Sequence, residues 1–393
     1  MENPEYSKTV NGIVARYRDD YRKKYKVTDH EEKVLRHIAM CRTEALGARE
    51  QTCDKCGYKL TLYNSCRDRN CPQCQSMKKE KWILDKKTEV LPFRYFHVVF
   101  TLPDKLNPIV VRNKRIVYDL LFEKVKETLL SVATEKKYFG ARIGFFAILH
   151  TWGQRLNLHP HLHCVVPGGG FDQRQKKWKK SSSGYLLPEE VLKKRFRSLF
   201  LVALKEKYKN SELFVTGSKF ENPDAFQSLI DELFKTEWVV YLKESFNDES
   251  SVIEYLGRYT HRIAISNYRI IKLKNEEVYF TYKDYKENNK RKVMKLHAVD
   301  FIRRFCLHIV PRRYVRIRYF GLLAHRNKKR TLSDCREFYE VKIPYEKKEY
   351  SWADILLRVT GIDPFKCPKC KVGRLIEENP RSVQFRAPPP VAI

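Results

Sequence analysis

Two pairs of closely spaced cysteines constrain the fold of this chain more than any other feature of its sequence. Cys53 and Cys56 form one CxxC motif, Cys71 and Cys74 form a second, and 14 residues lie between the pairs. Each CxxC turn can direct two thiolates at one ion, and two turns complete a tetrahedron. We therefore predict that these four cysteines bind one structural Zn²⁺.

The other cysteines leave several possibilities open. Cys66 lies between the two pairs and could replace one of the four ligands, or it could be a packing thiol. Cys367 and Cys370 form half of a further site, whose missing ligands could be Cys335, a distant histidine or another subunit. The remaining cysteines are most simply core residues: Cys41, Cys164 and Cys306.

The charge of the chain indicates a polyanionic partner. Its 393 residues include 78 Lys and Arg against 47 Asp and Glu, a net charge of +31. Such an excess favours nucleic acid, and the 23 tyrosines and 22 phenylalanines offer rings on which the bases of a single strand can stack. No apolar run reaches the roughly 20 residues of a membrane helix, and the N-terminus lacks a secretory signal. We therefore expect an intracellular location, in which the cysteines are thiols or metal ligands.

The hydrophobic pattern predicts an α+β fold. Apolar, β-rich runs indicate strands at 95–102, 142–152 and 161–166, and helical patterns lie before, between and after them. These helices are expected at 77–92, 108–135, 188–209, 223–235 and 250–261, with a further strand at 237–242. The order favours a mostly antiparallel sheet flanked by helices, with no doubly wound parallel sheet.

Four units follow from this order. We predict an N-terminal helical and zinc-binding domain at 1–92 and a catalytic domain at 93–270. A basic β/α extension covers 271–345, and a CxxC segment with a flexible tail covers 346–393.

The stretch "HPHLHCVV" at 159–166 carries the first candidate for chemistry. Alternate residues of a strand share a face, so His161 and His163 point the same way and Leu162 points into the core. Two neighbouring imidazoles can hold one divalent ion and leave positions open for a substrate. His159 has the same parity, but Pro160 interrupts regular pairing there.

The second candidate is the tyrosine pair in "YLGRY". Tyr255 and Tyr259 are four residues apart, so on a helix both hydroxyls lie on one face. A phenol is a poor nucleophile at neutral pH, but it can attack a phosphate whose oxygens a metal polarises. The alternative is an aromatic stripe that packs in a core. Arg258 and Arg262 beside the pair argue against a wholly buried face.

With these features in hand, the chain resembles a known family: the zinc-finger-bearing HUH transposases of the bacterial IS-ninety-one type, relatives of Helitrons that move by a rolling-circle route. The segments that carry the resemblance cover about three quarters of the chain in family order: "CRTEALG" (41–47), "YNSCRDRNCPQCQ" (63–75), "YFHVVFTLP" (95–103), "LHTWGQRLNLHPHLHCVVPGGG" (149–170), "EYLGRYTHRIAISNYRI" (254–270) and "FIRRFCLHIVP" (301–311).

The resemblance implies roles for individual residues. His161 and His163 would bind a catalytic Mg²⁺ or Mn²⁺ in an HUH motif, with Gln154 ranked ahead of His150 as the third ligand. Tyr255 and Tyr259 would form a 5′-phosphotyrosine link with single-stranded or hairpin DNA at the element ends. Host replication and helicase factors would assist in the bacterial cytoplasm, close to the nucleoid.

Basic residues near these motifs are the candidate DNA contacts. Arg67 and Arg69 flank the cysteine knuckle, and Arg258 and Arg262 flank the tyrosines. Arg303 and Arg304 lie on a basic helix expected after residue 298. Two departures from the family pattern are Asn70, where His is expected, and "RIRYFG" (316–321), where "RHYG" is expected.

Two other functions fit parts of the sequence. A rolling-circle replication initiator would use the same histidine and tyrosine chemistry. A non-catalytic zinc-ribbon protein that binds nucleic acid would explain the charge, the aromatic residues and the cysteines. It would leave the HxH and YxxxY pairs without a role.

Overall fold

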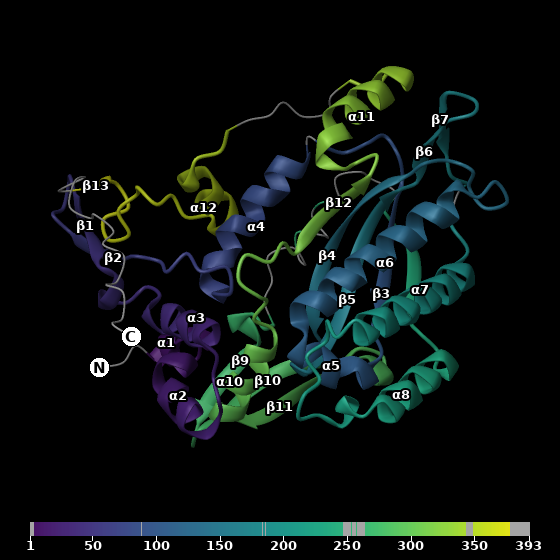
Figure 1. Ribbon diagram of the computed structural model, residues 1–393. Helices are drawn as coiled ribbons and strands as arrows, with labels where there is room; N and C mark the ends of the chain where they lie inside the picture. Colours follow the sequence, from purple (N-terminus) through teal and green to yellow (C-terminus); the bar gives the residue numbers. More distant parts are fainter. Residues whose placement is uncertain are drawn as a thin grey trace.

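A five-stranded antiparallel sheet organises the computed structural model, which describes residues 4–87, 89–182, 184, 186–246, 253, 257, 264–342 and 349–377. The strand order is β12-β4-β5-β3-β8 (Figure 1). The strands are β3 (Tyr95–Thr101), β4 (Gly144–Trp152), β5 (Leu158–Pro167), β8 (Val240–Phe246) and β12 (Ile317–Gly321). The predicted α+β class is confirmed.

One face of this sheet is covered by helices and forms the main core. Phe100 of β3 and Leu162 of β5 point to this side, where Phe196 and Trp238 pack edge to face. The covering helices are α5 (Asn107–Arg112), α6 (Lys114–Thr134), α7 (Glu189–Lys209) and α8 (Pro223–Lys235). The single helix predicted at 108–135 is two helices, because Asn113 adopts φ −127° and its amide bonds to the backbone of Ile109 and Phe214.

The other face of the sheet is only partly covered. The helix α4 (Pro72–Lys87) lies across one end of it, where Ile83 packs with Phe146 and Ile148. The remainder of this face carries polar side chains of β3, β4 and β5. Because residues alternate between faces, the odd-numbered residues of β3 and β5 point here, and the core lies beneath them.

A second core joins the N-terminal helices to a later part of the chain. The helices α2 (Val10–Lys24) and α3 (Asp29–Met40) share this core with α10 (Ala298–Leu307), and α1 (Pro4–Ser7) contacts α2. Beside them lies a sheet of β9 (Ile270–Lys274), β10 (Glu277–Asp284) and β11 (Lys290–His297). Thr28 and Glu31 form a capping box that fixes the start of α3.

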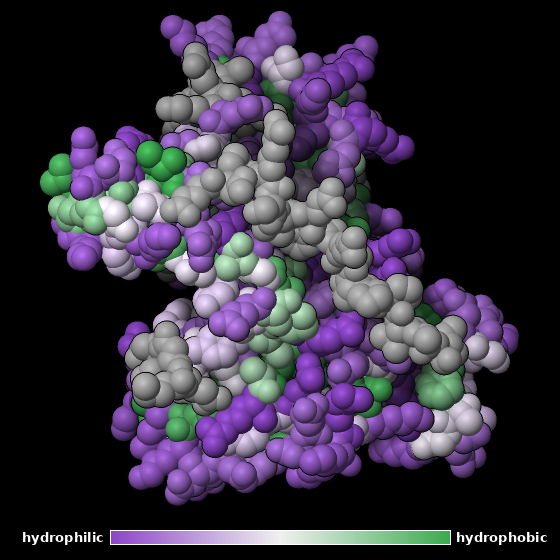
Figure 2. Space-filling model, turned by 90° about the vertical axis from the view of Figure 1, so that its left-hand side faces the viewer, coloured by the Kyte–Doolittle hydropathy of each residue, from purple (hydrophilic) through white to green (hydrophobic). Residues whose placement is uncertain are grey.

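A small ribbon contains both early and late residues. Its strand order is β13-β1-β2, with β1 (Ala48–Cys53), β2 (Lys59–Tyr63) and β13 (Leu375–Glu377). The last helix, α12 (Trp352–Thr360), packs on α4. Residues 349–377 of the predicted C-terminal CxxC segment are thus folded, and "RAPPPVAI", at the end of the predicted flexible tail, lies outside the described residues. Figure 2 views the molecule from the side of this ribbon, where hydrophilic side chains cover most of the face.

The remaining elements connect these parts. They are η1 (Glu44–Leu46), η2 (Asp104–Leu106), β6 (Gly169–Asp172), β7 (Lys177–Lys180), η3 (Lys219–Glu221), η4 (Asn267–Arg269), η5 (Tyr285–Glu287) and α11 (His325–Phe338). In the described part of the chain, no helix has the length and apolar character needed to cross a membrane.

Substitution of Leu162 tests whether the main core lies beneath the polar face of the sheet. Its side chain is fully buried, so Leu162→Ala leaves a cavity and is expected to lower the free energy of unfolding by about 3 kcal/mol in urea titrations. Leu357→Ala is the control, since that side chain on α12 is 46% exposed and its loss should cost less than about 0.5 kcal/mol. Equal losses for the two variants would contradict this assignment of the core.

Candidate metal centres and active site

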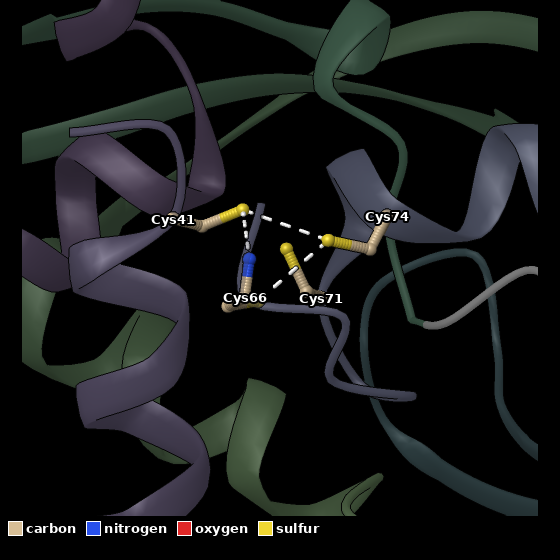
Figure 3. Close-up of side chains that lie close together, drawn as sticks. All are labelled: Cys41, Cys66, Cys71 and Cys74. Atoms are coloured by element: carbon tan, nitrogen blue, oxygen red, sulfur yellow. Dashed lines mark hydrogen bonds between the residues drawn. The ribbon is translucent and has the colours of Figure 1, made fainter. Parts of the chain in front are cut away.

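The first cysteine cluster joins Cys41, Cys66, Cys71 and Cys74 (Figure 3), whose sulfur atoms all lie within 4.8 Å of one another. The Sγ of Cys74 is 3.6 Å from the Sγ of Cys41 and 3.6 Å from that of Cys66. A tetrahedral zinc ion with Zn–S bonds of about 2.3 Å holds its sulfurs about 3.8 Å apart. The four side chains therefore fit one Zn²⁺.

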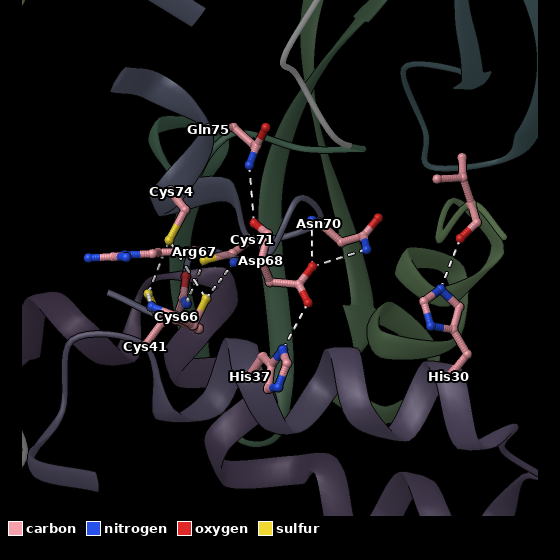
Figure 4. Close-up of polar contacts among 12 residues, drawn as sticks. His30, His37, Cys41, Cys66, Arg67, Asp68, Asn70, Cys71, Cys74 and Gln75 are labelled. Carbon is pink, nitrogen blue, oxygen red and sulfur yellow. Dashed lines mark hydrogen bonds and ion pairs between the residues drawn. The ribbon is translucent and has the colours of Figure 1, made fainter. Parts of the chain in front are cut away.

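Donors around this cluster suit thiolate ligands. The Sγ of Cys66 accepts a hydrogen bond from the backbone N–H of Asp68 at 3.4 Å, and that of Cys71 accepts one from the Asn11 amide at 3.5 Å. Asp68 in turn accepts from His37 at 2.9 Å and from the side chain of Asn70 at 3.1 Å (Figure 4). Asn70 thus fixes the loop that presents the ligands.

The second cysteine cluster joins Cys53 and Cys56 to Cys367 and Cys370. The Sγ atoms of Cys53 and Cys370 are 3.7 Å apart, as are those of Cys56 and Cys367. The backbone N–H of Gly373 donates to Cys370 at 3.2 Å and lowers the pKa of that thiol to about 6. A Cβ at Gly373 would lie 2.4 Å from the Sγ of Cys53, so only glycine fits there.

The predicted grouping of Cys53, Cys56, Cys71 and Cys74 around one ion is therefore wrong. The hairpin of β1 and β2 carries Cys53 and Cys56 away from the start of α4, where Cys71 and Cys74 lie, and toward β13. Cys41 belongs to a cluster, which corrects its interpretation as a core residue, and Cys66 is a full member of the same cluster. Cys335 is buried in a separate cluster.

The sequence contained a signal for some of the missed zinc ligands and none for others. Cys41 and Cys66 both lie within segments that carry the family resemblance, and Cys66 precedes Cys71 by five residues. The sequence identified Cys367 and Cys370 as a half site. Their partners could not be found from spacing, because Cys53 and Cys370 are 317 residues apart.

Elemental analysis of the purified chain tests the two clusters. Wild type should hold two zinc ions, and Cys71→Ser and Cys367→Ser should each lose one of them, because each removes a ligand from a different cluster. Cys53→Ser should lose the same ion as Cys367→Ser, so combining these two changes should release no more zinc. A stoichiometry of one in wild type, or loss of one shared ion from Cys53→Ser and Cys71→Ser, would contradict the division.

A histidine cluster lies on the partly covered face of the main sheet. In the pairing of β4 with β5, His150 lies directly opposite His161, so His150, His161 and His163 share this face. The Nε2 atoms of His161 and His163 are 3.1 Å apart. Adjacent ligands of an octahedral ion with bonds of about 2.1 Å are about 3.0 Å apart, so the spacing of the pair suits two ligands of one divalent ion.

Hydrogen bonds orient two of these rings. The Nδ1 of His161 lies 2.6 Å from the backbone oxygen of His159, and the Nδ1 of His163 lies 2.7 Å from the Nε2 of His97. With Nδ1 as the donor in each bond, both Nε2 atoms are the unprotonated nitrogens, as metal-binding histidines require. His97 on β3 is a positioning residue that the sequence analysis missed.

Burial keeps the rings neutral. It lowers the pKa of His161 to about 3 and that of His97 to about 4, and it holds the pKa of His163 well below its usual range. At neutral pH these imidazoles are therefore in the uncharged form that binds metals. The site does not require a pH change to become ready for an ion.

The histidines line a cavity of about 240 Å³, together with Gln154 and Tyr285. The amide of Gln154 donates to the hydroxyl of Tyr285 at 3.0 Å and accepts from the backbone N–H of Lys283 at 3.4 Å. Both ends of that amide are thus engaged by the β10–β11 side of the cavity. The geometry favours His150 over Gln154 as the third ligand. His159 lines the cavity, but its Nδ1 lies 3.5 Å from a carboxylate oxygen of Asp104.

The predicted nucleophiles, Tyr255 and Tyr259, lie outside the described residues. Arg258 and Arg262 lie outside them as well. Two residues of the same segment are described, and both are helical. Ile253 packs with Ile83, Phe146 and Val165 on the histidine-bearing side of the sheet. Gly257 lies so close to α4 that a Cβ there would be 2.2 Å from the Cδ1 of Ile83.

The other arginines predicted to contact DNA differ in exposure and in the groups that they contact. Arg67 is exposed beside the first cysteine cluster, and Arg69 donates to the backbone oxygen of Tyr314 at 2.5 Å. Arg303 lies over the ring of Tyr25, and Arg304 donates to the backbone oxygen of Arg155 at 2.9 Å. Arg303 and Arg304, both on α10, therefore contact other parts of the chain, which the sequence alone could not show.

The fold and these sites define a class: a zinc-binding α+β protein with a histidine centre on the partly covered face of its sheet. Comparison with known proteins narrows the class. Residues 13–102 match the family described as "Transposase zinc-binding domain", of the IS91 type, and residues 144–330 match the family described as "Putative transposase". No solved structure matches the chain.

Two relatives extend over most of the chain. "Putative transposase y4qJ" of Sinorhizobium fredii is 42% identical over 375 residues, which cover 93% of this chain and 94% of the relative. "Transposase for insertion sequence element IS801" of Pseudomonas savastanoi pv. phaseolicola is 29% identical over 87% of this chain and 82% of the relative. The chain belongs to the family of IS91-type transposases, the family that its sequence motifs resemble.

Manganese binding distinguishes the candidate ligands. Titration of Mn²⁺ followed by electron paramagnetic resonance should show no high-affinity site in His163→Ala. His150→Ala should bind at least about tenfold more weakly, because it removes a direct ligand. Gln154→Ala is the matched control on the same cavity wall and should change affinity less than about threefold. The reverse order for His150→Ala and Gln154→Ala would contradict the assignment.

Proposed function

We propose that this transposase nicks and rejoins single-stranded DNA at the ends of its element through a tyrosine nucleophile and a 5′-phosphotyrosine intermediate. One observation carries the proposal. Three buried histidines form a metal-sized cluster on the face of the sheet against which Ile253, from the tyrosine segment, also packs. Family membership supplies the DNA substrate, and the net charge of +31 supports binding to it.

The histidines prepare the site before DNA arrives. His150, His161 and His163 would hold the divalent ion, and an ion there would polarise the oxygens of the scissile phosphate. His97 and the backbone oxygen of His159 keep the rings in one orientation, so little reorganisation is needed during the reaction. The floor of the cavity is the β4–β5–β3 part of the sheet, in which β5 is paired on both sides.

The covalent step would be a transesterification. The hydroxyl oxygen of Tyr255 or Tyr259 attacks the phosphorus, the bond from phosphorus to the 3′ oxygen breaks, and the 3′ oxygen leaves as a free hydroxyl after taking up a proton. The phenol loses its proton to solvent as the new bond forms. Because one phosphate ester replaces another, the bond energy is conserved and ATP is not required. The sequence contains no GxxxxGK[ST] motif for nucleotide binding.

The phosphotyrosine can then be resolved in two ways. Attack by a 3′ hydroxyl restores a phosphodiester and frees the tyrosine. Attack by the second phenol transfers the strand to the other tyrosine. Host replication would displace the cleaved strand. Relatives named as transposases favour this cycle over replication initiation, which would use the same chemistry.

Capture of a labelled single-stranded oligonucleotide on a denaturing gel tests the nucleophiles. Tyr255→Phe and Tyr259→Phe should each reduce the covalent adduct formed with Mn²⁺, and the double variant should form none, because phenylalanine has no oxygen to attack with. Tyr285→Phe is the matched control, since Tyr285 is a described tyrosine that lines the histidine cavity. It should retain the adduct.

Two outcomes would contradict the assignment. An adduct in the double variant would move the nucleophile elsewhere, and its loss in Tyr285→Phe alone would identify Tyr285. Each variant should first show unchanged zinc content and circular dichroism, so that loss of the adduct reports chemistry and not unfolding.

A further inference from the structure

A basic cavity lies on the opposite side of β4 from β5, at the edge of the main sheet. It has a volume of about 430 Å³ and is lined by the first cysteine knuckle, the start of α4 and the segment that leads into β12. Four cationic side chains line it: Arg69, Lys78, Arg313 and Arg316. No acidic side chain lies among its lining residues in the described part of the chain.

Arg316 is the buried cation of this cavity. Only 7% of it is exposed, and it lines the cavity. Within the described ranges, no residue offers its guanidinium a hydrogen bond or a carboxylate, and the charge that acts on it most is the like charge of Arg69. Burial, and then Arg69, lower the pKa of Arg316 to about 10. Burying a cation without a partner is costly, so the arrangement favours an anion in the cavity.

Among the residues that the structure describes, the neighbouring groups do not compensate this charge. Arg69 donates one N–H to the backbone oxygen of Tyr314 at 2.5 Å, which fixes its guanidinium and leaves other donors available. The nearest acid on the knuckle is Asp68, whose carboxylate already accepts from His37 at 2.9 Å and from Asn70 (Figure 4). Lys78 and Arg313 are exposed and complete the rim of the cavity.

The cavity borders β4, the strand that carries His150. The backbone oxygen of Arg316 accepts a hydrogen bond from the N–H of Leu149 at 2.9 Å, and Leu149 precedes His150 in β4. Adjacent strands lie about 4.8 Å apart, so the backbone of Arg316 lies one strand spacing from β4, in which Leu149 and His150 point to opposite faces. Paired guanidinium groups recognise phosphate oxygens better than any other common anion-binding side chain.

We propose that this cavity binds a backbone phosphate of the same DNA strand that carries the scissile phosphate. The inference rests on the proposed function for the identity of that strand. Arg316 and Arg69 would hold the phosphate, and Lys78 and Arg313 would guide the strand toward the zinc knuckle.

The test is the salt dependence of binding to a fluorescein-labelled 24-nucleotide oligo-dT, followed by anisotropy without divalent ions. Arg316→Gln should lower the affinity about tenfold at 0.1 M salt, because it removes a charge-assisted contact. The slope of log K against log salt should fall in magnitude by about 0.7, the value for one contact to a single strand. Lys205→Gln on α7 makes the same charge change on the far face of the sheet, and its affinity and slope should match wild type.

A slope unchanged in Arg316→Gln, or changed equally in Lys205→Gln, would overturn the proposal. If Arg316→Gln fails to fold, Arg313→Gln on the exposed rim replaces it and should show a smaller loss of slope in the same direction. No loss of slope in a folded Arg313→Gln would then count against the site.

The assay is also run in the Tyr255→Phe/Tyr259→Phe background. There an incorrect nucleophile assignment leaves the effect of Arg316→Gln on the slope intact, whereas an incorrect phosphate site removes it.

Discussion

The structure depends on the register in which β4 pairs with β5. Opposite positions bring His150 to His161 on one face, and on the other face Leu149 lies opposite Leu162 within the main core. A shift of one residue would turn the histidines into the core and the leucines to solvent. The helices α6 and α7, which cover the apolar face, therefore specify the position of the metal ligands as well as the stability of the fold.

The two cysteine clusters extend this organisation to the ends of the chain. The second cluster connects residues 317 positions apart, and α12 from the same C-terminal segment packs on α4. The helix α4 begins at Pro72, between Cys71 and Cys74, and contacts Gly257 of the tyrosine segment. A continuous set of contacts thus leads from both zinc sites to the segment that carries the proposed nucleophiles. A metal clip across so long a loop is also an efficient way to stabilise a chain end.

Much of the local structure could be predicted from sequence. The period of two placed His161 and His163 on one face, and the helical pattern at 223–235 coincides with α8. Features that depend on long-range pairing could not be predicted. The partners of Cys53 and Cys56 come from the far end of the chain. The preference for His150 over Gln154 as a ligand depends on the β4–β5 register and on the hydrogen bond that the Gln154 amide donates to Tyr285. The break at Asn113 results from a contact with Phe214, 101 residues later.

The central claim is that the histidine cluster and the tyrosine segment share one face of the sheet. Loading the site with Fe²⁺ and adding ascorbate and peroxide would generate hydroxyl radicals that oxidise only nearby residues, which mass spectrometry can map. The account predicts oxidation in residues 95–101, 148–163 and 251–263, all of it absent from His163→Ala. Oxidation of the first two segments with residues 251–263 untouched would contradict it.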